Sequence, residues 1–123
     1  MRRLITAAVL VALAPTALSA RERVPAATPA GDTIDCLQLR QIRETRVRDD
    51  QTIDFYTLGG KVYRNTFPYS CPGLGFEQRY AYETSLDRLC SVDTITVLMA
   101  PPLTRGATCG LGKFQPVTLA KTR

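Results

Sequence analysis

The chain has 123 residues, is 45% hydrophobic, contains no histidine and no tryptophan, and has a formal net charge of +5. This length allows one small domain, and the lack of histidine excludes the commonest general base and the Ser-His and Cys-His pairs of many hydrolases. Basic and acidic residues are interspersed rather than gathered into a block, which is typical of a solvated surface.

The first 20 residues have the pattern of a cleaved export signal. A positive start at Arg2 and Arg3 precedes a largely apolar run, residues 4–14, and small residues lead up to Ala20. The run is too short for a membrane span, which needs about 20 residues. We therefore expect residues 1–20 to be a signal peptide. The mature protein, with 14 basic and 11 acidic residues, should then be periplasmic or secreted and have no transmembrane segment.

A flexible leader is expected over residues 21–32, which are rich in Ala and Pro and have few large apolar side chains. Such a segment buries too little surface to offset the entropy lost on ordering it. The folded domain is then expected over residues 33–120. Because so small a domain buries a modest share of its surface, disulfides should contribute much of its stability.

The centre of the chain predicts a β-hairpin. Residues 52–58 and 62–67 are rich in β-branched and aromatic side chains, and Gly59-Gly60 between them favours a two-residue turn with positive φ angles. In that register Phe55 lies opposite Arg64.

Further strands are predicted over residues 42–48, 76–82, 92–99 and 109–119. Prolines and glycines frame a loop over residues 67–74. A single helical turn is predicted from Thr84, with Leu86, Leu89 and Cys90 on one face. The expected fold class is all-β: a small five- to six-stranded antiparallel barrel or sandwich with one short helical turn, braced by disulfides.

Four cysteines, at positions 36, 71, 90 and 109, all lie beyond the export signal. In an oxidising compartment they are expected to form two disulfides, and three pairings are open. We favour Cys36 with Cys109, which joins the ends of the folded region, and Cys71 with Cys90, which ties the loop to the helical turn. Zinc and redox sites usually require closely spaced Cys-x-x-Cys pairs, so neither a metal nor a cofactor is expected.

Carboxylates are the remaining route to catalysis, because glycoside hydrolysis needs only two acids across a cleft. Each carboxylate is more simply a turn residue or a solvated strand residue, so we do not expect an enzyme. A hydrolase using Asp54 and Asp93 is the less favoured alternative. The candidate residues are Asp49, Asp50, Asp54, Glu77, Glu83 and Asp93.

Two features favour binding. Tyr63, Arg64 and Arg79 are candidates for a binding face, since Tyr and Arg are enriched in interface hot spots. The alternative is that such rings complete the core with their hydroxyls at its edge. The second feature is the loop over residues 67–74, which a secreted inhibitor could present as a rigid element to a target enzyme.

Five segments resemble a family of small exported bacterial proteins to which no activity is assigned. The resemblance implies export and a single disulfide-bearing domain, and it supplies no catalytic residues. We therefore expect a non-enzymatic binding or structural role at the cell envelope, with an unknown protein or envelope component as partner and no nucleic acid. A secreted enzyme inhibitor is the first alternative. The segments are VRDDQTI (47–53), KVYRN (61–65), SCPGL (70–74), LCSVD (89–93) and CGLGKF (109–114).

Overall fold

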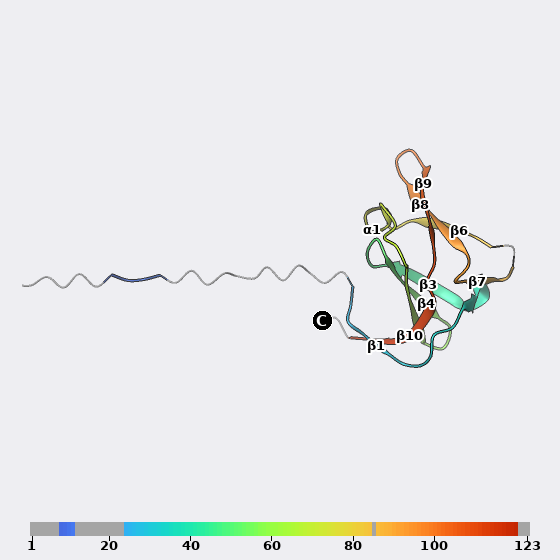
Figure 1. The fold of residues 1–123 in the computed structure, drawn as a ribbon, viewed down its shortest axis with the longest axis horizontal. Helices are drawn as coiled ribbons and strands as arrows, with labels where there is room; N and C mark the ends of the chain where they lie inside the picture. Colours follow the sequence, from blue (N-terminus) through green and yellow to red (C-terminus); the bar gives the residue numbers. More distant parts are fainter. Residues whose placement is uncertain (1–7, 12–23, 85, 121–123) are drawn as a thin grey trace, which may run out of the picture.

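The computed structural model of the chain describes residues 8–11, 24–84 and 86–120. Most of the predicted signal peptide therefore lies outside the described residues. The described part is built from short strands, with one α-helix and one 3-10 turn (Figure 1). The elements in chain order are β1 (Ala27–Pro29), β2 (Cys36–Gln38), the 3-10 turn Leu39–Gln41, β3 (Ile42–Val47), β4 (Thr52–Thr57), β5 (Val62–Thr66), α1 (Leu74–Glu77), β6 (Tyr80–Glu83), β7 (Arg88–Cys90), β8 (Thr94–Met99), β9 (Thr104–Gly110) and β10 (Phe114–Leu119).

The strands form three antiparallel sheets. The largest has the order β1-β10-β5-β4-β3, a second has the order β6-β8-β9, and β2 pairs with β7 alone. The outer strands of the largest sheet, β1 and β3, do not pair with each other, so the described residues form no closed barrel. The all-β, disulfide-braced fold class is confirmed. The helices of the described residues are neither long enough nor apolar enough to span a bilayer.

One hydrophobic core joins the sheets. Phe55 on β4 and Phe114 on β10 are fully buried, and their rings meet edge to face with centroids 5.3 Å apart. Ile95 and Val97 on β8 reach the same core from the smaller sheet. This packing follows from the alternation of side chains along each strand, which sends every second residue inward.

Part of the predicted flexible leader belongs to the sheet. Residues 27–29 form β1, which pairs with β10 in the register Ala27–Leu119 to Pro29–Val117. Ala30 N–H also donates to the Pro116 carbonyl at 2.9 Å. The folded body therefore begins before residue 33. Backbone ladder bonds order this segment, although its small side chains bury little surface.

The predicted hairpin between β4 and β5 is confirmed, but its register is shifted by one residue. Phe55 lies opposite Tyr63, and Asp54 lies opposite Arg64. The turn contains three residues, because Thr57 N–H donates to the Lys61 carbonyl and Leu58 joins the two glycines in the loop. The reason is the pleat: in the expected register Arg64 would share the core-facing side with buried Phe55.

The helical turn predicted near Thr84 is wrong. Leu89 and Cys90 belong to β7, and Ser85 lies outside the described residues. The Thr84 hydroxyl does organise a turn, donating to the Arg88 carbonyl at 2.8 Å, but that turn leads into a strand. The short α-helix of the described residues, α1, instead begins at the last residue of the Pro/Gly-rich loop and takes up the first two residues of the strand predicted at 76–82. The Gly73 backbone, with φ of 84°, starts it.

Both favoured disulfide pairings are wrong. Cys36 bonds to Cys90, and Cys71 bonds to Cys109. The first pairing follows from strand register: Cys36 lies directly opposite Cys90 in the β2–β7 ladder, with Cα atoms 4.0 Å apart. The second joins the loop after β5 to β9. All four cysteines are paired, which is compatible with an oxidising compartment.

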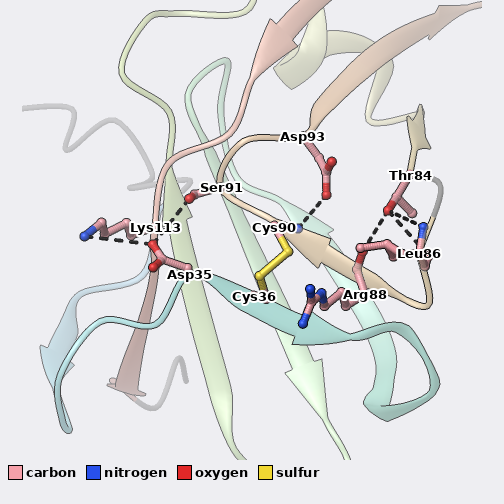
Figure 2. The surroundings of a disulfide bond; sticks show 9 residues. All are labelled: Asp35, Cys36, Thr84, Leu86, Arg88, Cys90, Ser91, Asp93 and Lys113. Carbon is pink, nitrogen blue, oxygen red and sulfur yellow. Dashed lines mark hydrogen bonds and ion pairs between the residues drawn. A yellow bond between two sulfur atoms is a disulfide. The ribbon is translucent and has the colours of Figure 1, made fainter.

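The Cys36–Cys90 disulfide is surrounded by polar contacts that hold the neighbouring turns (Figure 2). The Asp93 carboxylate accepts a hydrogen bond from Cys90 N–H at 2.7 Å. Ser91 N–H donates to the Asp35 carbonyl at 2.8 Å and thereby extends the strand pairing by one step. This disulfide therefore joins two strands that already pair.

Candidate functional site: a disulfide-anchored loop

The three residues of the predicted binding face do not form one face. Tyr63 and Arg64 are consecutive in β5, so their side chains point to opposite sides of the sheet. Tyr63 packs against the core, whereas Arg64 pairs with Asp54 on the other side. Arg79 lies just before β6, with its guanidinium 3.7 Å from the Glu77 carboxylate. The structure thus distributes these candidates over separate surfaces.

The outer side of the largest sheet carries an ion cluster centred on Asp54. This carboxylate is fully buried, and it accepts hydrogen bonds at 2.8 Å from Nε of both Arg48 and Arg64. Arg64 Nη2 donates a further bond at 3.0 Å, and Arg48 Nη2 donates to the Tyr56 hydroxyl at 2.9 Å. Charge-assisted bonds of this geometry offset the cost of burying the carboxylate. The cluster joins β4, β5 and the residue after β3, which is a structural arrangement.

The other candidate carboxylates are also engaged. Asp93 accepts the Cys90 N–H in the turn after β7, whereas Asp54 on β4 is held by two arginines, so each of the two proposed catalytic acids has a structural partner of its own. Asp49 and Asp50 each accept a backbone N–H at 2.8 Å. Among the described residues, no group of three or more His, Cys, Asp or Glu side chains gathers to hold a metal ion.

The tyrosines are similarly dispersed. Tyr80 on β6 packs against the core, and burial raises the pKa of its hydroxyl. Tyr56 lies under the Arg46 guanidinium, 5.0 Å from its ring centroid, and a hydrogen bond to Glu44 raises the pKa of that arginine. Only Tyr69 among the five tyrosines is almost fully exposed, at 82%. It lies in the loop proposed for an inhibitor.

This loop, residues 67–74, is held from within the protein; we call it the anchored loop. Its end residues Phe67 and Leu74 are fully or almost fully buried. Cys71, in its middle, is also buried and bonds to Cys109 on β9. The chain between these three fixed points carries Tyr69 outward. The sequence allows this because Pro and Gly frame the loop while a large apolar residue stands at each end.

The turn between β3 and β4 holds the anchored loop from the side. Cys71 N–H donates to the Asp50 carbonyl at 2.6 Å, and Gly75 N–H donates to the Asp50 carboxylate at 2.8 Å. Gln51 contributes a third contact, since its side-chain amide donates to the Phe67 carbonyl at 2.7 Å. The Asp50 carboxylate thus satisfies an N–H at the start of α1 that the helix itself leaves without a partner.

Two large aromatic side chains are exposed in this region. Phe76 on α1 is 86% exposed, so both Phe76 and Tyr69 present a large aromatic side chain to solvent. An open cavity of about 440 Å³ lies between Phe76, Ser70 and the Asp49–Asp50 turn. A second cavity, also of about 440 Å³, separates the loop from β9. The loop is therefore a ridge between two hollows.

The sequence predicts the loop, which contains Tyr69, as a binding element, but it does not predict the exposed Phe76 beside it. Phe76 was assigned to a strand, where alternation predicts half burial. The exposure of Tyr69 follows from its place between Pro68 and the buried Cys71.

No family model matches the chain, and neither a curated protein nor a solved structure matches it. The resemblance to a family of exported proteins therefore stays a prediction.

Proposed function

We propose that the chain is an exported domain that binds a protein partner at the cell envelope through the anchored loop and α1, without catalysing a reaction. Its location would be periplasmic or secreted. The export pattern of residues 1–20 and the pairing of all four cysteines favour that location.

The observation that carries the proposal is the exposure of Tyr69 and Phe76 on a segment that Phe67, Cys71 and Leu74 fix to the core. Aromatic side chains dominate interface hot spots because they bury much area at small entropic cost. A loop held by a disulfide and by buried residues at both ends is ordered before it binds, so association does not have to order it. Together these features favour a protein surface as ligand.

The test is capture and cross-linking from envelope extract. A photo-reactive residue replaces Tyr69, and a matched protein carries it at Val92, which is 88% exposed in the turn after β7. We expect one cross-linked partner from position 69 and none from position 92. The Tyr69→Ala, Phe76→Ala double variant should no longer capture the partner. Its melting temperature should stay within about 2 °C of wild type, which corresponds to a change of about 0.5 kcal/mol in the free energy of unfolding.

Equal cross-linking from both positions, or full capture by the double variant, would contradict the proposal. A Val92→Ala variant serves as the second control, because it removes an equally exposed apolar side chain elsewhere.

The geometry of the ridge also favours a second candidate, the secreted inhibitor. A projecting segment held at its ends and middle is suited to entering an enzyme cleft. Purified protein would be assayed at micromolar concentration against lysozymes and secreted proteases. Inhibition that disappears with Tyr69→Ala would identify the loop as the inhibitory element, and no inhibition at that concentration would reject this candidate.

A further inference from the structure

The β8–β9 hairpin ends in an unusually apolar tip. From Val97 to Leu103 the sequence is VLMAPPL, without one side chain that can form a strong hydrogen bond. We call residues 99–103 the hairpin tip; all five are exposed. Met99 is 45% exposed and Leu103 is 69% exposed. In Figure 1 the hairpin stands out from the body at the end opposite to β1 and β10.

A consecutive exposed apolar run of this kind has no role in the protein's own core. Exposed apolar residues are ordinary when scattered singly, but a contiguous patch marks a contact surface. Scattered examples occur elsewhere in the described residues, at Leu58 and Val92. The tip differs because its apolar residues are consecutive and project together.

Three features distinguish the tip from a protein-binding surface. It has no aromatic residue and no arginine, the residue types that carry most interface energy. It offers no polar side chain that could select one partner. It is convex rather than hollow, since the tip is the turn of a two-stranded hairpin (Figure 1). A fluid apolar phase accommodates such a shape without a complementary pocket.

The backbone of the tip favours the same environment. Pro101 and Pro102 have no N–H, so two backbone donors that would lose water on insertion are missing. Beyond the Leu98–Arg105 pair the hairpin extends by about three residues, or about 10 Å at 3.3 Å per residue. This length is comparable to the depth of about 5–10 Å to which interfacial amphipathic helices bury their apolar face at the boundary between headgroups and acyl chains.

The charges near the tip fit a lipid surface. Residues 94–110, which span β8 and β9, contain no Asp or Glu. Arg105, two residues beyond Leu103, has a side chain that is 69% exposed and lies 3.3 Å from the equally exposed Glu83 carboxylate. Such an exposed pair is weak, so the guanidinium can exchange it for a phosphate. A long arginine side chain suits the level of the headgroups.

We propose that the hairpin tip inserts into the interfacial layer of a lipid bilayer, with Arg105 beside the headgroup phosphates. The inference depends on the proposed function only for access, because an exported protein meets an envelope membrane. The protein would then hold its anchored loop near a membrane surface while the tip keeps it there.

The experiment uses the lack of tryptophan in the chain. Leu103→Trp places one fluorophore in the tip, and Val92→Trp places one at a matched exposed site away from it. The oxidised proteins are mixed with vesicles of phosphatidylcholine, alone or with phosphatidylglycerol. We expect a blue shift and quenching by brominated lipid at position 103 and neither at position 92. An unshifted spectrum at position 103 overturns the proposal.

Vesicle flotation of proteins without the fluorophore provides the second readout. Leu103→Asp should lower the partition coefficient at least tenfold, whereas Val92→Asp should leave it unchanged. Equal flotation of Leu103→Asp and wild type overturns the proposal. A blue shift at position 103 without vesicles, together with a dimer in light scattering, also overturns it, because the tip would then contact a second copy.

The two proposals fail separately. The Tyr69→Ala, Phe76→Ala variant should float with vesicles as wild type does, whether or not it captures a protein. Loss of flotation in that variant would assign the lipid contact to the anchored loop and overturn the inference about the tip.

Discussion

The anchored loop and the hairpin tip both expose apolar residues, but they are held in different ways. The loop is fixed by its disulfide, by its own buried end residues and by three hydrogen bonds with the β3–β4 turn. Phe67 N–H and Cys71 N–H donate to backbone carbonyls of that turn, and the Gln51 side chain donates to the Phe67 carbonyl. The tip is continuous with β8 and β9, and the strand ladder ends at the Met99–Thr104 pair. The loop is therefore determined by contacts distant in sequence, and the tip by contacts close in sequence.

This difference matches what each surface would meet. A protein partner has a fixed shape, so a binding loop gains affinity from being ordered in advance. A bilayer is deformable, so an inserted tip needs apolar area more than a fixed shape. Measurements that separate stability from binding can test this contrast.

Removing the Cys71–Cys109 disulfide should have the largest effect. For a sequence separation of 38, the Cys71→Ala, Cys109→Ala variant should lose about 4 kcal/mol in the free energy of unfolding under the loop-entropy model. Denaturant titration measures the loss. In this variant, hydrogen exchange should be faster at the backbone amide of residue 71 and at neighbouring amides of the loop.

The matched control is Cys36→Ala, Cys90→Ala. Its sequence separation of 54 predicts a similar loss, about 4 kcal/mol. It joins strands that already pair, so protection in the anchored loop should change only as global stability does. If both double variants expose the loop equally, the loop is not held by its own disulfide as we argue.

Two leucines give the second prediction. Leu74→Ala at the buried end of the loop should cost about 3 kcal/mol, because it removes a fully buried side chain and leaves a cavity. Leu103→Ala in the tip should change stability by less than about 0.5 kcal/mol. The same chemical change is thus expected to act on folding in one region and on vesicle binding in the other. Equal costs at both sites would remove the contrast.

Sequence patterns predicted the parts of the fold that depend on neighbouring residues. The all-β class and the hairpin between residues 52–58 and 62–67 follow from β-branched and aromatic composition and from the Gly-Gly turn. The one-residue register error shows the limit. Two glycines allow a turn of two or three residues, and the burial of Phe55 beside Tyr63 selects three.

The disulfide pairing and the helix position depend on contacts distant in sequence. Cys36 and Leu37 lie opposite Cys90 and Leu89, so the segments Cys-Leu and Leu-Cys form a mirrored pair in an antiparallel ladder. That symmetry is visible in the sequence, but it is informative only once the two segments are known to pair. Without that knowledge, the spacing of Leu86, Leu89 and Cys90 fits one face of a helix equally well.

For the candidate site, the local sequence pattern predicts the loop but not which side chains near it are exposed. It placed Tyr63 and Arg64 on one binding face, although strand alternation separates neighbours. The Pro/Gly-framed loop was found, but the exposure of Phe76 depends on α1, which the sequence pattern assigned to a strand.

Asp50 provides a prediction of intermediate size that sharpens the account of the loop. Asp50→Ala removes the acceptor for Gly75 N–H and should cost about 1 kcal/mol, comparable to the loss of a helix N-cap. Asp87→Ala, an exposed control, should cost less than about 0.5 kcal/mol. Thermal unfolding measures both. A neutral Asp50→Ala would mean that the β3–β4 turn contacts the loop without stabilising it.

The smallest expected effect on folding concerns Arg105. Because the Glu83 and Arg105 side chains are each 69% exposed, Arg105→Gln should change the free energy of unfolding by less than about 0.5 kcal/mol. The same variant should bind vesicles containing phosphatidylglycerol several-fold more weakly, and added salt should reduce wild-type binding toward that level. Flotation at two salt concentrations measures this. A change in stability without a change in flotation would place Arg105 in the fold rather than at the lipid surface. Weaker flotation with unchanged stability would show that Arg105 contributes to lipid binding although it contributes little to folding, as we expect for a residue next to the tip.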